Sequence, residues 1–178
     1  MSTYRTSSIV AASSFVTGIA LMGHEWAHVL AGWLAGGTPT LVTSTEVLGD
    51  YSSLTTPGFV ALGFSGSAFN VVLCAFGWWG LQRFAGGDDA LLTAWFCYAI
   101  NGMLVTTKMI GESLAGWGDW MTILNHLPLP TVMRGLVCAT GLTGLIVMVR
   151  SAGPALPCPP SAGQNPDIVD LQSIRSLE

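Results

Sequence analysis

The residues best suited to chemistry form a short run inside an apolar stretch, Gly23-His24-Glu25-Trp26-Ala27-His28. An ionisable side chain at membrane depth costs on the order of 2.5–3.5 kcal/mol on insertion scales, so three of them need a compensating partner. The pattern His-Glu-x-x-His supplies one, because residues four apart share a helix face and both imidazoles can bind one zinc ion. Glu25 lies about 100° around the same helix and can act as general base on a water molecule. The alternative is a buried histidine pair with Glu25 as its counter-charge.

A catalytic zinc site needs a third protein ligand and an open position. Residues 108–126 are the place to look, because the connections after the first and third apolar stretches lie on the same side of the membrane. Asp119 is the preferred ligand, since it is acidic, follows a glycine-rich turn and begins a short helix. Its alternative role is an ordinary helix cap. Weaker ligand candidates, in decreasing order, are Glu112, His126 and Glu46.

Composition places this site in a membrane protein. The chain has 178 residues, of which 51% are hydrophobic and 9% charged, and its mean hydropathy is +0.57. These values are typical of a multi-pass protein whose surroundings are the lipid bilayer. The formal charge of −4 includes no basic run, so nothing indicates a nucleic-acid partner, and nothing indicates an oligomeric state. The spacing of the cysteines is typical of neither a disulfide framework nor a zinc ribbon, and all four are interpreted as unpaired.

Four apolar stretches predict an all-α integral membrane protein with one domain over residues 1–150. The expected helices are 9–35, 57–81, 90–107 and 131–149. The third is expected to be broken after Thr107 or followed by a re-entrant segment, because irregular backbone at membrane depth must line a cavity. β-Branched residues in 40–47 favour a short β-hairpin at the membrane face, with an irregular loop as the alternative. Residues 151–178 are rich in Pro, Ser and Gly, which predicts a disordered tail.

The order of the motifs resembles the site-2 protease group of intramembrane zinc metallopeptidases, the M50 family, and especially its small M50B-like members. The segments that carry the resemblance are 24–28, Ser65-Gly66-Ser67-Ala68-Phe69-Asn70 and Gly116-Trp117-Gly118-Asp119-Trp120. The resemblance implies that zinc is bound by His24, His28 and Asp119. It also implies that Glu25 activates water and that Asn70 lies near the substrate. The family's Asn-x-x-Pro is absent before the aspartate, and a tryptophan follows that aspartate where the family has glycine.

The predicted function is an intramembrane zinc metalloprotease that hydrolyses peptide bonds of membrane-embedded or membrane-proximal segments of transmembrane proteins. An extended substrate segment would pair with a strand from residues 40–47. Two other classes remain: a metal-binding or helix-binding pseudo-protease without hydrolysis, and a purely structural subunit without metal. Membrane orientation has two opposing indications. The distribution of Lys and Arg weakly favours both termini in the cytosol, whereas the resemblance places the catalytic side there.

Overall fold

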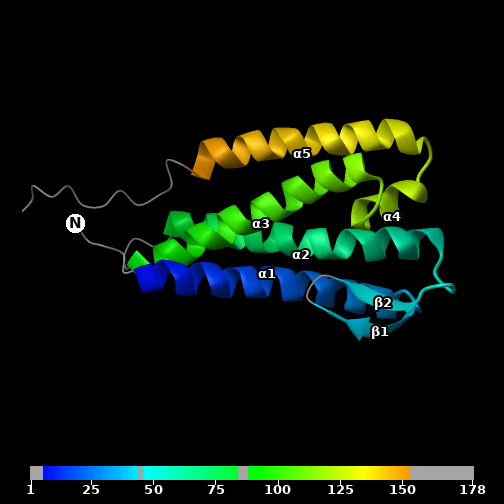
Figure 1. The fold of residues 1–178 in the computed structure, drawn as a ribbon, viewed down its shortest axis with the longest axis horizontal. Helices are drawn as coiled ribbons and strands as arrows, with labels where there is room; N and C mark the ends of the chain where they lie inside the picture. Colours follow the sequence, from blue (N-terminus) through cyan, green and yellow to red (C-terminus); the bar gives the residue numbers. More distant parts are fainter. Residues whose placement is uncertain (1–5, 44–45, 84–87, 153–178) are drawn as a thin grey trace, which may run out of the picture.

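The computed structural model describes residues 6–43, 46–83 and 88–152, and the predicted tail from residue 153 onward lies outside this part. The elements, in chain order, are α1 (Thr6–Leu34), β1 (Thr38–Val42), β2 (Val47–Asp50), α2 (Thr56–Arg83), α3 (Asp88–Ala115), α4 (Asp119–Asn125) and α5 (Pro130–Ala152). Helices α1, α2, α3 and α5 are long and apolar enough to cross a membrane. They run along the long axis of the molecule, with the hairpin and α4 at the same end (Figure 1). The predicted helical architecture with four helices long and apolar enough to cross a membrane is confirmed.

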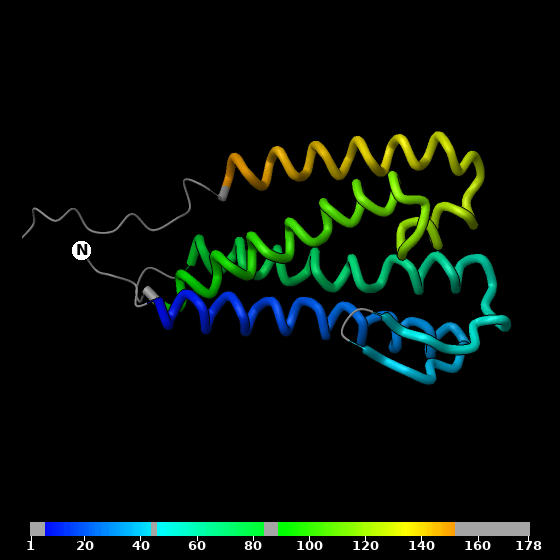
Figure 2. The backbone as a smooth tube through the Cα atoms, viewed as in Figure 1, coloured from blue at the N-terminus to red at the C-terminus, as the bar shows by residue number. Residues whose placement is uncertain are grey.

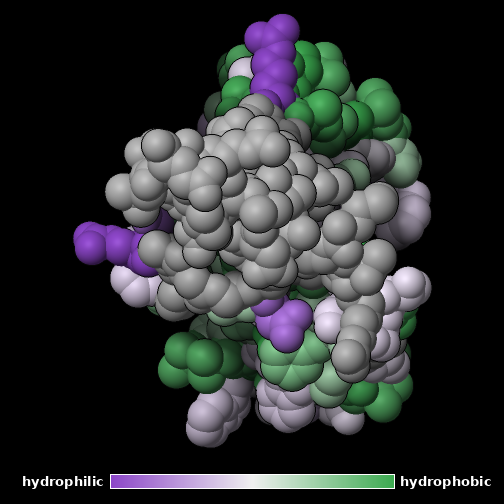
Figure 3. Space-filling model, turned by 90° about the vertical axis from the view of Figure 1, so that its left-hand side faces the viewer, coloured by the Kyte–Doolittle hydropathy of each residue, from purple (hydrophilic) through white to green (hydrophobic). Residues whose placement is uncertain are grey.

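The interior of the bundle holds polar side chains as well as apolar ones, and its outer surface exposes many large apolar side chains. The side chains with the least exposure include His24, Asn70 and Asn101, whereas Trp33 and Val149 are more than 60% exposed. Where the described surface is visible in Figure 3, hydrophobic residues are prominent and strongly hydrophilic ones are isolated. Outward-facing apolar side chains suit lipid, which leaves the polar groups to meet one another inside.

The end of α1 directs the chain into the hairpin. Gly36 has φ 94°, and its N–H donates to Trp33 O at 3.0 Å, while the Gly37 N–H donates to Gly32 O at 2.8 Å. This pair of bonds is a Schellman motif, in which glycine takes the left-handed position at low cost. Strands β1 and β2 then pair in antiparallel register, from Thr38 opposite Asp50 to Val42 opposite Val47. The predicted hairpin is confirmed, and it lies beside the second half of α1 (Figure 2).

The third long helix differs from its prediction, because α3 continues unbroken to Ala115 and the expected break after Thr107 is wrong. A single glycine inside a helix costs only about 1 kcal/mol relative to alanine, so Gly111 does not end α3. Arg134 of α5 donates from Nε and Nη2 to Ser113 O, at 3.0 and 2.6 Å, and satisfies a carbonyl of the last turn. The turn 116–118 then leads into the short helix α4, which packs against α2 and α3.

Candidate metal centre

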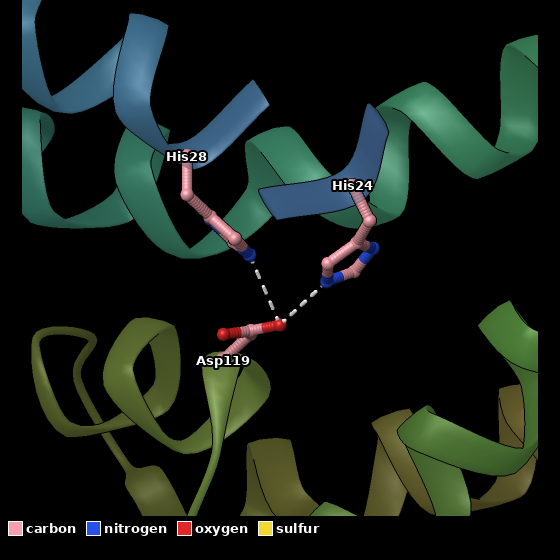
Figure 4. Close-up of side chains that lie close together, drawn as sticks. All are labelled: His24, His28 and Asp119. Carbon is pink, nitrogen blue, oxygen red and sulfur yellow. Dashed lines mark hydrogen bonds and ion pairs between the residues drawn. The ribbon is translucent and has the colours of Figure 1, made fainter. Parts of the chain in front are cut away.

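Three side chains from two helices converge on one point. His24 and His28 extend from one face of α1 toward Asp119 at the start of α4 (Figure 4). Asp119 Oδ2 lies 3.0 Å from His24 Nε2 and 3.2 Å from His28 Nε2. The three ligand atoms lie within 4.8 Å of one another, and no other such group is found in residues 6–43, 46–83 and 88–152. The structure therefore brings together the two histidines and the preferred third candidate.

The start of α4 fixes the position of Asp119. Gly118 has φ 105°, a left-handed conformation that favours glycine, and a Cβ at this position would overlap the Glu112 carboxylate. Glu112 Oε2 accepts a hydrogen bond from the Trp120 N–H at 2.8 Å and so satisfies a free donor of the first turn of α4. Glu112 thus positions the helix that carries Asp119 and does not join the ligand group.

The remaining candidates lie apart from the three converging atoms. His126 stacks on Phe59, with ring centroids 4.4 Å apart, and its Nδ1–H donates to Thr122 O at 2.7 Å. Glu46 belongs to the connection between the hairpin strands and lines a cavity of about 790 Å³ that also borders the site. His28, Glu25 and Asp119 line the same cavity, so the predicted general base faces the space beside the ligand group.

The second nitrogen of His28 has a strong partner of its own. Its Nδ1–H donates to Leu62 O at 2.7 Å, and Ser65 Oγ lies 3.1 Å from the same nitrogen. In the neutral ring Nε2 then carries the lone pair, which faces Asp119 Oδ2, and this buried nitrogen has no hydrogen-bond partner in the described part of the chain. Two lone pairs at this distance repel each other, so the geometry requires either a proton on Nε2 or a metal cation between the two atoms. A ring nitrogen fixed by an outer partner is typical of metal-binding histidines.

Asn70 takes the corresponding place behind His24. Its Nδ2 lies 3.1 Å from His24 Nδ1, the residue is 2% exposed, and its Oδ1 has no hydrogen-bond partner among the residues that the structure describes. Oxygen and nitrogen of an amide are interchangeable by a 180° rotation. With Oδ1 toward the ring, Asn70 accepts from the Nδ1–H and leaves the Nε2 lone pair directed at Asp119. A positioning contact thus accompanies the predicted substrate role of Asn70, which stays a prediction.

Space and charge at the centre both fit a divalent cation. A Cβ at Gly66 would lie 2.5 Å from Nε2 of His24 and of His28, so the backbone of α2 leaves room there only because residue 66 is glycine. Counted at formal charge, Glu25, Glu112 and Asp119 contribute −3 and Lys108 contributes +1, and a divalent ion would neutralise the resulting −2. Two imidazoles and a carboxylate suit zinc and other first-row divalent metals.

Lys108 is the site residue that the sequence motifs did not reveal. Its Nζ lies 2.7 Å from His24 Nε2, 2.8 Å from Asp119 Oδ2 and 3.7 Å from Glu112 Oε1. The signal that could have found it is its spacing: it precedes Glu112 by four residues and so shares its helix face, at the end of an apolar stretch. Burial opposes ionisation of Asp119, but hydrogen bonds from His24 and His28 in their Nε2-protonated forms and the charge of Lys108 together hold the pKa of Asp119 well below its ordinary value.

Comparison with known proteins finds no relative of this chain. No protein-family model matches the chain, and no curated protein or solved structure matches it either. The interpretation of the site therefore depends on its residues, their distances and the resemblance carried by its motifs.

Proposed function

We propose that this chain is an intramembrane zinc metalloprotease that hydrolyses peptide bonds of membrane-embedded or membrane-proximal segments. The observation that carries the proposal is the convergence of His24, His28 and Asp119 beside a cavity lined by Glu25. The motif resemblance to the site-2 protease group points to the same reaction. Four helices long and apolar enough to cross a membrane support access to such segments.

The residues of the site have different roles in the proposed reaction. Bound zinc would supply a Lewis acid that polarises the peptide carbonyl and makes water a stronger acid. Glu25 takes the proton from the attacking water and returns it to the leaving amine. His24 and His28 are held in orientation by Asn70 and by the carbonyl of Leu62, so the site is organised before substrate arrives.

The hairpin supports a substrate that is extended rather than helical. A peptide bond inside a helix has its carbonyl engaged in a hydrogen bond, so a transmembrane segment must unwind before it is attacked. Val47 of β2 lines the cavity, and a two-stranded sheet leaves one edge of each strand unpaired. An unwound segment can add to such an edge through main-chain hydrogen bonds while its carbonyl reaches the site.

A second candidate function is a metal-binding or helix-binding protein without hydrolysis. The observation in its favour is Lys108, whose ammonium group already lies against two of the three ligand atoms. A cation of the protein itself would then compensate the carboxylates, and the cavity would only hold a partner segment.

The experiment measures zinc content and cleavage on the same detergent-purified samples. The probe is a fluorescently labelled transmembrane peptide with an Asn-Gly pair in its apolar segment, which eases unwinding. We expect about one zinc per wild-type chain, and cleavage that Glu25→Gln lowers by roughly 10²–10⁴-fold while zinc stays bound. Asp89→Asn, an exposed carboxylate at the start of α3, is the control and keeps full turnover.

Three results would decide against the proposal. A wild-type protein without metal contradicts the zinc centre. Near-normal turnover of Glu25→Gln removes the general base and the protease assignment with it. Bound zinc without cleavage of any transmembrane peptide favours the second candidate.

A further inference from the structure

The ammonium group of Lys108 shares its position with the metal that the site is proposed to bind. Lys108 lies near the end of α3 with its side chain 32% exposed, yet its Nζ reaches inward to His24 Nε2 at 2.7 Å and to Asp119 Oδ2 at 2.8 Å. Charge-assisted hydrogen bonds of this length are about twice as strong as neutral ones. Lys108 is therefore bound to two of the three candidate ligand atoms.

Lys108 and a metal ion would compete for the same lone pair of His24 Nε2. One ring nitrogen cannot donate to Asp119 and accept from Lys108 at the same time. If Nε2 accepts from the ammonium, its lone pair and that of Asp119 Oδ2 both point at the same cation. A metal ion uses these same two lone pairs, so a metal and the ammonium cannot both hold them.

Glu112 offers Lys108 a second partner within reach. Its Oε1 lies 3.7 Å from the Lys108 Nζ, across one helical turn of α3. The other oxygen, Oε2, stays bound to the Trp120 N–H at 2.8 Å. Lys108 can thus move from Asp119 to Glu112 by rotating its own side chain, while the contact that positions α4 remains.

We propose that Lys108 competes with the metal for His24 and Asp119, lowers the metal affinity of the site, and pairs with Glu112 when the metal binds. This inference rests on the proposed metal centre and needs no proteolysis. In the metal-bound arrangement Lys108 and Glu112 form a neutral pair. Glu25 and Asp119 then balance the divalent ion, so no buried charge is left uncompensated.

The test is the zinc affinity of the full-length, metal-stripped chain in detergent, measured by competition with a chromophoric chelator. Lys108→Met keeps the length of the apolar stem and removes the charge. We expect it to bind zinc about tenfold more tightly than wild type, because no charge-assisted hydrogen bond has to be broken first. A merely structural role of Lys108 predicts weaker binding. An unchanged or lower affinity of Lys108→Met overturns the inference.

Exchange of partners is tested with Glu112→Gln, alone and combined with Lys108→Met. Glutamine still offers an oxygen to the Trp120 N–H but no negative charge. Its expected effect is several-fold weaker zinc binding in the wild-type background and less than about twofold change when Lys108 is also replaced. Equal losses in both backgrounds mean that Glu112 acts through α4, which overturns the proposed pairing.

Arg134→Met is the matched control, since it removes a nearby cation that binds Ser113 O and not the ligand group. Its zinc affinity should stay within about twofold of wild type. A rise equal to that of Lys108→Met would show general electrostatics and refute the competition. If wild type binds no zinc and Lys108→Met does, the competition is supported while the proposed zinc protease fails. Tight and equal binding by both leaves the metal centre standing and refutes the competition.

Discussion

Buried polar side chains are arranged differently at the two ends of the bundle. At the histidine end, which holds the hairpin, α4 and the ligand group, Asp119 Oδ2 contacts side chains from α1 and α3 at once. At the opposite end, where α1 begins and α5 ends, the side-chain contact between Tyr98 and Ser151 joins a single pair, whose oxygens lie 2.6 Å apart. A shared network loses several contacts when one member is removed, whereas an isolated pair loses one. We therefore infer that the histidine end binds the metal and that the other end mainly stabilises the helix packing.

The largest difference in zinc affinity should appear between replacing a buried polar residue of the ligand group and replacing one outside it. Asp119→Asn removes the charge on which both histidines and Lys108 converge, so its loss of zinc affinity should exceed the roughly 10–100-fold cost of losing an outer-shell partner. Asn101 lies in the middle of α3 and donates only within its own helix, to Cys97 O at 2.9 Å. Asn101→Leu should change zinc affinity by less than about twofold. Chelator competition on both variants measures this, and retained tight binding by Asp119→Asn would exclude that residue as a ligand.

Replacing a glycine by alanine in each region, at Gly66 and at Gly102, provides a second comparison of zinc affinity. A methyl group at Gly66 would lie 2.5 Å from both histidine Nε2 atoms, inside the space that the metal needs. A methyl group at Gly102 would meet the end of the Met148 side chain, which is flexible and can turn aside. We expect Gly66→Ala to weaken zinc binding by some tens-fold and Gly102→Ala to leave it unchanged at a stability cost of about 1 kcal/mol. Absorption spectra of the cobalt-loaded variants would compare their metal binding. Equal spectra for Gly66→Ala and Gly102→Ala would contradict the assigned position of the metal.

The contrast between the ends also separates what the sequence could predict from what it could not. The helices were predictable because their apolar runs are long enough to cross a bilayer, and the spacing of His24 and His28 puts both on one helix face. The preference for Asp119 among four candidates rested on local signals, acidity and a glycine-rich turn. Its position at the histidines agrees with that preference, while its role as ligand stays a prediction.

Features that depend on distant packing were beyond local patterns. The extension of α3 through Gly111 is supported by Arg134, which comes from another helix and reaches Ser113 O. Lys108 belongs to no motif, and only the placement of α4 brings Asp119 to its ammonium group. Both features require two helices to meet, which no single stretch of sequence specifies.

A smaller difference in zinc affinity is expected between variants that remove the outer partner of His24 and of His28. Asn70→Leu removes the polar group that faces His24 Nδ1, and we expect zinc binding to weaken about tenfold. Ser65→Ala removes a hydroxyl near His28 Nδ1, but Leu62 O still accepts from that nitrogen at 2.7 Å. Its loss should therefore stay below about threefold. Isothermal titration with zinc compares the two variants, and equal losses would show that Asn70 does not orient its histidine.

The smallest effect is expected at the opposite end, from Tyr98→Phe. This change removes one hydrogen bond between α3 and α5, in a region where the helices otherwise meet through small and apolar side chains. Interhelical hydrogen bonds in membrane proteins contribute about 0.6 kcal/mol on average, because the unfolded chain in the membrane also finds partners. We expect the free energy of unfolding, measured by denaturant titration in micelles, to fall by about that amount, with zinc affinity unchanged. Ser151→Ala removes the same interhelical contact together with the bond that Ser151 Oγ donates to Val147 O at 2.7 Å, so Tyr98→Phe should add no further loss in the Ser151→Ala background. A change of zinc affinity in any of these variants would show that the two ends are coupled through α3, and the division between site and scaffold would no longer hold.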